Sequence, residues 1–194
     1  MSIRTLSLVI LVLAVIACNR PKPDMFLLAK EGDVKLEIDS VGVPELAAFP
    51  LRFKLTNNTN KNVVLALDTI ANKYEDQLKN LYITADQDTF FLGIKSQEHY
   101  IIFSPRTSTS FLGFGYFLYG KGHFDSFKEI DTVFKKGRLE YRFDDKILQN
   151  IRFKGMLAEA DTILVPSKLE ASTDKAQIVE RFQPESLRWR EKKL

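Results

Sequence analysis

Apolar and polar residues alternate with a period of two along the first part of the body of the chain. From residue 34, apolar side chains alternate with charged ones, and residues 51–56 repeat this alternation. Such a period is typical of a half-buried β-strand. An apolar run at 63–67 follows an asparagine-rich stretch at 57–62, and Asn readily adopts turn conformations. The pattern therefore predicts two strands joined into a hairpin through a turn at 57–62.

Further segments with apolar or alternating character predict more strands downstream. Residues 81–83 and 89–94 predict a second hairpin around the turn Asp86-Gln87-Asp88. Residues 109–119 include a stretch that is apolar on both faces, so we expect a central strand that is covered on both sides. The remaining strand candidates are the segments 100–103, 139–143, 151–153 and 162–165.

One helix is marked by its ends as well as by its period. Ser126 and Glu129 have the spacing of a capping box, in which each side chain accepts a hydrogen bond from a free backbone N–H. Gly137 is placed to end the helix in the left-handed conformation. A second, weaker helix is predicted at 72–80. Four apolar residues share one face of the first helix: Phe127, Ile130, Val133 and Phe134.

Several short strands separated by turn signals predict an all-β fold, an antiparallel β-sandwich with one or two short helices. We expect this domain at 31–170, followed by a charged C-terminal tail at 171–194. The tail has two interpretations, a partly helical segment packed on the domain or a basic, Trp189-bearing segment at a membrane surface. The run Phe-Lys-Leu-Thr-Asn-Asn-Thr at 53–59 resembles the second strand of bacterial immunoglobulin-like domains. That resemblance implies an immunoglobulin-like sandwich, without the Cys and Trp landmarks of antibody domains.

The N-terminal segment has the order of features found in a signal peptide. Arg4 supplies a positive charge, and the apolar run at 6–16 is interrupted by a single serine. This run is shorter than the about 20 apolar residues that a membrane-spanning helix needs. It ends in Val15-Ile16-Ala17-Cys18, which resembles the lipobox of bacterial lipoproteins. An uncleaved membrane anchor and an ordinary secretory signal are the alternative interpretations.

The lipobox resemblance implies a site of lipidation and a location. It implies cleavage of a signal peptide at 1–17, acylation of Cys18, and attachment to a membrane through the lipid. Residues 18–30 are then a tether, with prolines at two of its positions. Asn19 lacks the Asp that favours retention in the inner membrane of enterobacteria. The expected location is therefore the cell envelope, with the outer membrane favoured over the inner where a cell has both.

Composition and charge exclude several classes of protein. The 194 residues suit one domain with extensions, and the 28 basic and 25 acidic residues leave a net charge of +3. No block of five or more basic residues occurs, so a nucleic-acid interface is not expected. Cys18 is the only cysteine, which excludes an intramolecular disulfide and a thiolate metal cluster.

Motifs of the common catalytic sites are missing from the sequence. The chain has no serine-hydrolase elbow, no zinc-protease histidine pair and no phosphate-binding loop. The two histidines, His99 and His123, are expected to be ordinary surface residues. We therefore assign no catalytic residue, no metal and no cofactor. Carboxylates could still act in acid–base catalysis, and the candidates would be Asp86, Asp88 and Asp144.

Aromatic residues between 111 and 127 form the best candidate for a binding surface. Aromatic side chains supply large, rigid contact areas, although packing in the core explains the same residues. The first hypothesis is a non-enzymatic, lipid-anchored binding or assembly component of the cell envelope, with an envelope protein or a glycan as partner. The alternative is an envelope hydrolase or glycan-active enzyme that uses carboxylates. The candidate binding residues are Phe111, Phe114, Tyr116 and Tyr119.

Overall fold

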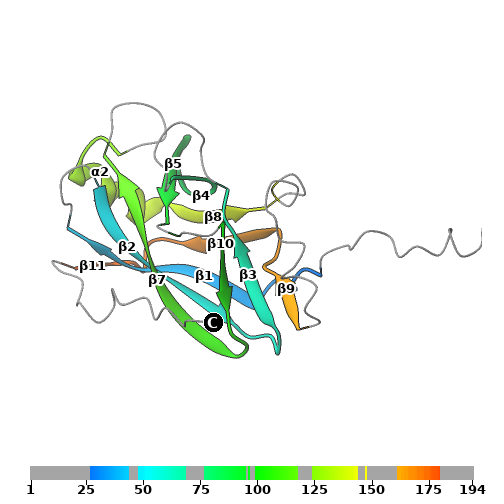
Figure 1. Ribbon diagram of the computed structural model, residues 1–194. Coiled ribbons are helices and arrows are strands. Elements are labelled where there is room, and N and C mark those ends of the chain that lie inside the picture. Colours follow the sequence, from blue (N-terminus) through cyan, green and yellow to red (C-terminus); the bar gives the residue numbers. More distant parts are fainter. Residues whose placement is uncertain are drawn as a thin grey trace, which may run out of the picture.

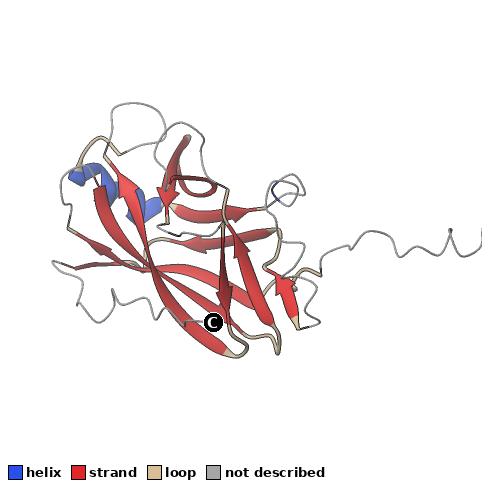
Figure 2. Cartoon of the chain, viewed as in Figure 1, coloured by secondary structure: helices blue, strands red, loops and turns tan. Residues whose placement is uncertain are grey.

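The structure is a computed structural model, and it describes residues 27–43, 48–68, 77–94, 96, 99–117, 124–143, 147 and 161–179. Within these ranges strands dominate and one helix, α2, lies at one end of the molecule (Figure 2). The expectation of an all-β fold is confirmed. Several expected features lie outside the described residues: the signal peptide, Cys18, the strand at 151–153, Tyr119, His123 and Asp144.

The described strands form two sheets. The larger, eight-stranded sheet has the order β10-β8-β4-β5-β7-β2-β1-β11 and is strongly curled, while the smaller has the order β6-β3-β9 (Figure 1). Neighbouring strands are antiparallel except for the pairs β1–β11 and β3–β9, which are parallel. The elements are β1 (Val34–Gly42), β2 (Ala48–Asn57), β3 (Asn62–Ala66), β4 (Gln77–Ala85), β5 (Asp88–Gly93), β6 (Tyr100–Phe103), β7 (Thr107–Tyr116), α2 (Phe127–Lys136), β8 (Arg138–Arg142), β9 (Thr162–Leu164), β10 (Lys168–Ser172) and β11 (Gln177–Val179).

The two predicted hairpins have opposite outcomes. The second is confirmed, because β4 and β5 pair up to Ala85 and Asp88 around a tight turn in which Asp86 has a positive φ of 52°. The first is wrong. β2 pairs with β1 and β7, whereas β3 pairs with β6 and β9 in the other sheet. The stretch at 57–62 is therefore a corner that carries the chain from one sheet to the other.

Asn57 holds this corner together from a fully buried position. Its Nδ2 donates hydrogen bonds to the carbonyl oxygens of Lys61 (2.9 Å), Phe103 (3.2 Å) and Ser104 (3.0 Å). Its Oδ1 accepts from the backbone N–H and the hydroxyl of Thr59, at 3.0 and 2.7 Å. Buried polar groups are costly unless paired, so this one side chain satisfies both the turn and the end of β6.

β7 lies in the middle of the larger sheet, as predicted, but in its apolar part, residues 111–116, only the inner face is fully buried. Two glycines on that face lie directly under phenylalanine rings of β2. A Cβ added to Gly115 would lie 2.0 Å from Phe49 Cζ, and one added to Gly113 would lie 2.3 Å from Phe53 Cε2. The outer apolar side chains of the same strand, Leu112, Phe114 and Tyr116, are only partly buried. The expected cover on both sides is therefore wrong, and the glycines make room for rings inside one core.

The helix has the predicted cap at its start and a different geometry at its end. The backbone N–H of Glu129 donates to Ser126 Oγ, and Glu129 Oε2 accepts from the N–H of Asp125 (2.6 Å). Gly137 is extended, with φ −80° and ψ 166°, so the predicted left-handed closure is wrong. Glycine is required here for space, because a Cβ would lie 2.5 Å from the Val133 carbonyl oxygen. Ile130, Val133 and Phe134 are buried, as their shared face predicted.

The second predicted helix is also corrected where the structure describes it. Residues 77–80 belong to β4, and residues 72–76 lie outside the described ranges. Asn80 is buried and donates to the carbonyl oxygen of Ala66 (2.9 Å), while its Oδ1 accepts from the N–H of Asp68 (3.1 Å). These contacts with β3 and the loop after it favour the strand, because tertiary contacts routinely override weak helix propensity.

The tail expected from residue 171 contributes strands to the larger sheet. Residues 171 and 172 complete β10, and β11 pairs in parallel with Ser40–Gly42 of β1. The expected domain end at 170 therefore falls within a strand, and the described part of the tail is extended, not helical. Residues from 180 onward lie outside the described ranges.

Replacing Asn57 with Ala should destabilise the fold by about 2–3 kcal/mol, because several buried hydrogen-bonding groups lose their partner together. Chemical denaturation followed by circular dichroism measures the change. Asn58→Ala is the matched control, since Asn58 is its exposed neighbour and should cost less than about 0.5 kcal/mol. Equal losses for the two variants would contradict the role given to Asn57.

Replacing Gly115 with Ala should destabilise the protein by about 1–3 kcal/mol, because the new methyl group collides with the Phe49 ring inside a packed core. Thermal unfolding measures this loss. Thr109→Ala is the control on the same strand, at an exposed position with no collision. A Gly115→Ala protein as stable as the control would show that the rings have space to move.

Candidate functional site

The predicted aromatic binding residues separate onto two faces of β7. Phe111 is only 4% exposed and packs in the core, where its ring stacks on Phe53 and contacts Phe103. Phe114 and Tyr116 are half-buried on the outer face of the sheet. Two of the four residues are therefore accessible in part on one face, while Tyr119 lies outside the described ranges.

The predicted acidic residues do not meet in a cavity within the described ranges. Asp86 and Asp88 are exposed on the β4–β5 turn, and Asp144 lies outside those ranges. His99 is exposed at the start of β6, where its backbone carbonyl accepts a hydrogen bond from the Leu67 N–H (2.8 Å). Asp86 and Asp88 are therefore turn residues and His99 is a surface residue, as the simpler interpretation of each had it. The carboxylate hypothesis stays a prediction.

A cleft lies between β1 and β10, where the curl of the larger sheet brings its two ends together. Cα atoms of the two strands approach to within 8 Å. Within the described part of the chain, no strand pairs with β10 on the side away from β8, and β11 covers only Ser40–Gly42 of β1. The remaining length of β1 and all of β10 thus face each other as strand edges.

The cleft has a volume of about 510 Å³. Aliphatic residues of alternate positions, Val34, Leu36 and Leu169, are at least nine-tenths buried and belong to the core beneath it. Charged residues between them point to the outer surface. One wall comes from the start of β1 and the turn before it, and the other from β10; the lining residues are Glu31, Gly32, Val34, Lys35, Leu36, Lys168, Leu169 and Glu170.

The same three residue types, Lys-Leu-Glu, occur on both sides of the cleft, at 35–37 and at 168–170. In each strand the lysine pairs with the glutamate two positions later. Lys35 Nζ lies 2.7 Å from Glu37 Oε1, and Lys168 Nζ lies 2.5 Å from Glu170 Oε1. Both lysines are about half-exposed, at 59% and 48%. Because solvent screens such exposed pairs, a partner can exchange them at little cost.

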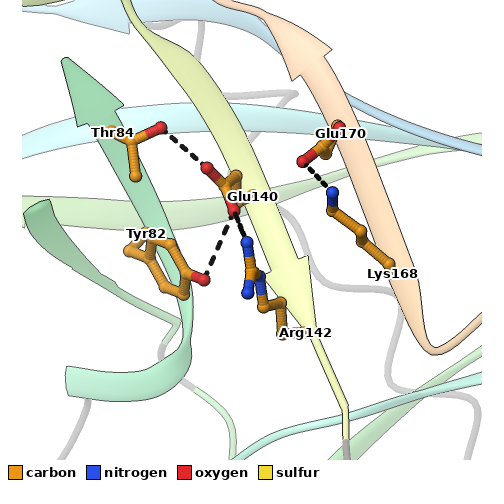
Figure 3. A network of polar contacts seen from close by, with 6 residues as sticks. All are labelled: Tyr82, Thr84, Glu140, Arg142, Lys168 and Glu170. Carbon is orange, nitrogen blue, oxygen red and sulfur yellow. Dashed lines mark hydrogen bonds and ion pairs between the residues drawn. The ribbon is translucent and has the colours of Figure 1, made fainter. Parts of the chain in front are cut away.

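β10 is poorly matched in charge to its neighbour β8. The register places Lys168 opposite Arg142, and Glu170 opposite Glu140. Like charges directly opposite in a sheet are destabilising. Each strand instead neutralises its charges with an ion pair of its own. Arg142 Nη2 donates to Glu140 Oε2 (2.9 Å) within β8, and Lys168 pairs with Glu170 within β10 (Figure 3).

Glu140 is the centre of the polar network beside the cleft. It is 7% exposed, and its carboxylate accepts hydrogen bonds from Thr84 Oγ1 (2.8 Å), Arg142 and the Tyr82 hydroxyl (Figure 3). Burial alone would raise the pKa of Glu140, but the bonds from Thr84 and Arg142 and the charges of Arg142 and Lys168 lower the pKa below its ordinary value. An acid with a lowered pKa is a poor proton donor near neutral pH. Glu140 is therefore a fixed negative charge that organises the outer face.

The cleft was not predicted from the sequence, because no strand was expected at 168–172 and the domain was expected to end at 170. The repeated Lys-Leu-Glu was the available signal, since each copy has the alternation of a half-buried strand. The closeness of the two copies depends on the curl of the sheet, and residues 35–37 and 168–170 are too distant in sequence for their pairing to be evident. The buried Glu140 was missed for a similar reason, because its partners come from two strands.

Comparison of the chain with protein-family models, with curated proteins and with solved structures found no match. Among the described residues, no helix has the length and apolar character to cross a membrane. Within the same ranges, no three His, Cys, Asp or Glu residues gather in a way that could hold a metal ion.

Replacing Glu140 with Gln should lower stability at neutral pH by about 1–2 kcal/mol, because hydrogen bonds to an ionised group are lost. The lowered pKa means that Glu140 stabilises the native state above the ordinary carboxyl pKa of 4.5, and that this contribution is lost as the pH falls through the lowered value. Unfolding curves of the two proteins should therefore converge in acid. Glu31→Gln is the exposed control, and a constant gap between wild type and Glu140→Gln at all pH values would contradict the account.

Proposed function

We propose that this chain is a lipid-anchored component of the bacterial cell envelope, and that its β-domain is a non-enzymatic module that binds another protein. The observation that carries the binding role is the cleft between the facing edges of β1 and β10. Attachment through Cys18 is supported by the lipobox-like Val15-Ile16-Ala17-Cys18. The lipid would hold the module at a membrane, where its partner is another envelope protein.

Exposed strand edges support protein binding for a general reason. Backbone N–H and C=O groups along an edge form hydrogen bonds with any extended segment placed beside them, and natural proteins cover or twist such edges when they are not used. Here two edges face each other across a space of about 510 Å³, above buried aliphatic residues. A cleft of this shape suits an extended polypeptide better than a compact ligand.

The finer fold assignment, an immunoglobulin-like β-sandwich, is also a proposal. It is supported by two sheets that share one hydrophobic core and by the position of residues 53–59, which run from β2 into the corner between the sheets. A solution structure would test it. A structure in which the smaller sheet did not pack over the core of the larger sheet would contradict the assignment.

Replacing Cys18 with Ser should abolish lipid attachment and release the protein from the membrane fraction. Fractionation of cells that express the full chain, with detection by an affinity tag, measures the distribution. Several acyl chains bind durably whereas none remain in the variant, so we expect a shift of most of the protein. Asn19→Ser is the adjacent control. A Cys18→Ser protein that stays in the membrane would contradict the anchor.

The binding role is tested by photo-cross-linking in the lipidated, full-length protein. A photoreactive residue in place of Lys168, at the rim of the cleft, should give a discrete adduct with an envelope protein. The same residue in place of Lys128, which is exposed on α2, is the control and should not give that adduct. Absence of an adduct at position 168, or the same adduct at both positions, would contradict the proposed binding site.

A further inference from the structure

We propose that one extended segment of the partner protein fills the cleft as an added β-strand, running antiparallel to both β1 and β10. We further propose that the segment carries a basic residue, an apolar residue and an acidic residue, in this order. The inference rests on the proposed function of the cleft and specifies its ligand. Three independent features support it: strand direction, side-chain alternation and charge order.

Strand direction follows from the order of the larger sheet. From β10 to β1, in the order β10-β8-β4-β5-β7-β2-β1, every neighbouring pair is antiparallel. Seven strands of alternating direction leave β10 and β1 pointing the same way. A single strand that is antiparallel to both would complete an alternating ring, and antiparallel pairing is slightly more stable per residue than parallel pairing.

The alternation of side chains determines where apolar residues belong in the ligand. Leu36 and Leu169 point to the core from the two edges, whereas the lysines and glutamates beside them point outward. A strand that continues this sheet has the same alternation, because successive side chains point to opposite faces. The middle residue of the ligand motif is therefore apolar and lies over the core, between two outward-facing charged residues.

Charge order follows from the identical Lys-Leu-Glu tripeptides. Both edges present lysine first and glutamate second along the same direction. An antiparallel ligand meets Glu37 and Glu170 first and then the two lysines, so its basic residue precedes its acidic residue by two positions. Opposite charges across a sheet are stabilising, and β8 places like charges opposite β10, so the added strand supplies the complement that β8 lacks.

The width of the cleft requires the two edges to open on binding. An inserted strand lies about 4.8 Å from each neighbour and would hold β1 and β10 roughly 9.6 Å apart. Their Cα atoms now approach to within 8 Å, so the edges must move apart when the strand enters. β10 is suited to this movement, since within the described residues it pairs only with β8.

The test compares two peptides of identical composition. The probe is fluorescein-labelled Thr-Val-Lys-Val-Glu-Val-Thr, and its reversed sequence, Thr-Val-Glu-Val-Lys-Val-Thr, is the control with the same net charge and apolar content. We expect the first to bind the purified domain with a Kd at least about tenfold lower, because four charge pairs change sign between the two. Fluorescence anisotropy measures both. Equal affinities, or tighter binding of the reversed peptide, would overturn the proposed order and direction.

A charge exchange in the protein should reverse this preference. In the variant Lys35→Glu, Glu37→Lys, Lys168→Glu and Glu170→Lys, all changed side chains are at least 27% exposed, so folding should persist, as circular dichroism would verify. The matched control exchanges Asp131 and Lys135, an ion pair on α2. We expect the first variant to prefer the reversed peptide by at least about fivefold and the control to behave as wild type. An unchanged preference in the first variant overturns the proposal.

The failure of this inference can be distinguished from the failure of the proposed function. A protein adduct at position 168 combined with no preference between the peptides would overturn the ligand motif and leave the binding role intact. Absence of both results would overturn both proposals. An adduct between two copies of this chain would show that the cleft serves self-association, which contradicts a separate partner protein.

Discussion

The packing of two phenylalanine rings of β2 onto two glycines of β7 is the interaction on which the larger sheet depends. Phe49 and Phe53 of β2 occupy the space that side chains at Gly115 and Gly113 of β7 would fill, so the two strands can pair closely while both rings stay in the core. The Phe49 ring also contacts Phe124 at 5.0 Å and Phe134 at 6.4 Å between ring centroids. This places α2 over one end of the sheet. Glycines in strands commonly mark points of bending, and here they accompany the curl that brings the distant ends of the sheet together.

The curl creates the cleft, because a sheet that closes on itself imperfectly leaves two edges facing each other. The hydrophobic core is continuous across the cleft, since Val34 and Leu36 from one edge and Leu169 from the other belong to the same core. Closure by hydrogen bonds is lacking in the described part of the chain, because no strand pairing joins β1 to β10. The hydrophobic effect is non-directional, whereas hydrogen bonding in a sheet requires a fixed spacing and register. Apolar side chains from the two edges can therefore share one core even though the backbone groups of the edges do not pair with each other.

Local signals determined how much could be predicted from the sequence. The alternation at 34–38, the β4–β5 turn and the cap at Ser126 depend on neighbours in sequence, and the structure confirms all three. The hairpin across 57–62 was wrong, because Asn57 finds partners in Phe103 and Ser104, which are more than 40 positions away. The predicted left-handed closure at Gly137 was wrong. Glycine is needed there because a Cβ atom would collide with the carbonyl oxygen of Val133, and the periodicity of the sequence does not reveal that contact. For the same reason the cleft was not predicted, since its walls come from opposite ends of the domain.

The charges around the cleft show how a sheet can be stable and yet incomplete. Between β8 and β10 the register sets like charges opposite each other, and each strand neutralises them by pairing along its own length. Glu140 is held in place by Thr84 and Arg142 and cannot serve an incoming ligand. Lys168 and Glu170, by contrast, form an ion pair with each other at the surface, and Lys35 forms one with the partly buried Glu37 across the cleft. Their mutual pairs are weak because water screens them. The two strand edges therefore combine backbone groups available for pairing with side chains that lose little by changing partners, and such a combination favours an added strand over a closed ring.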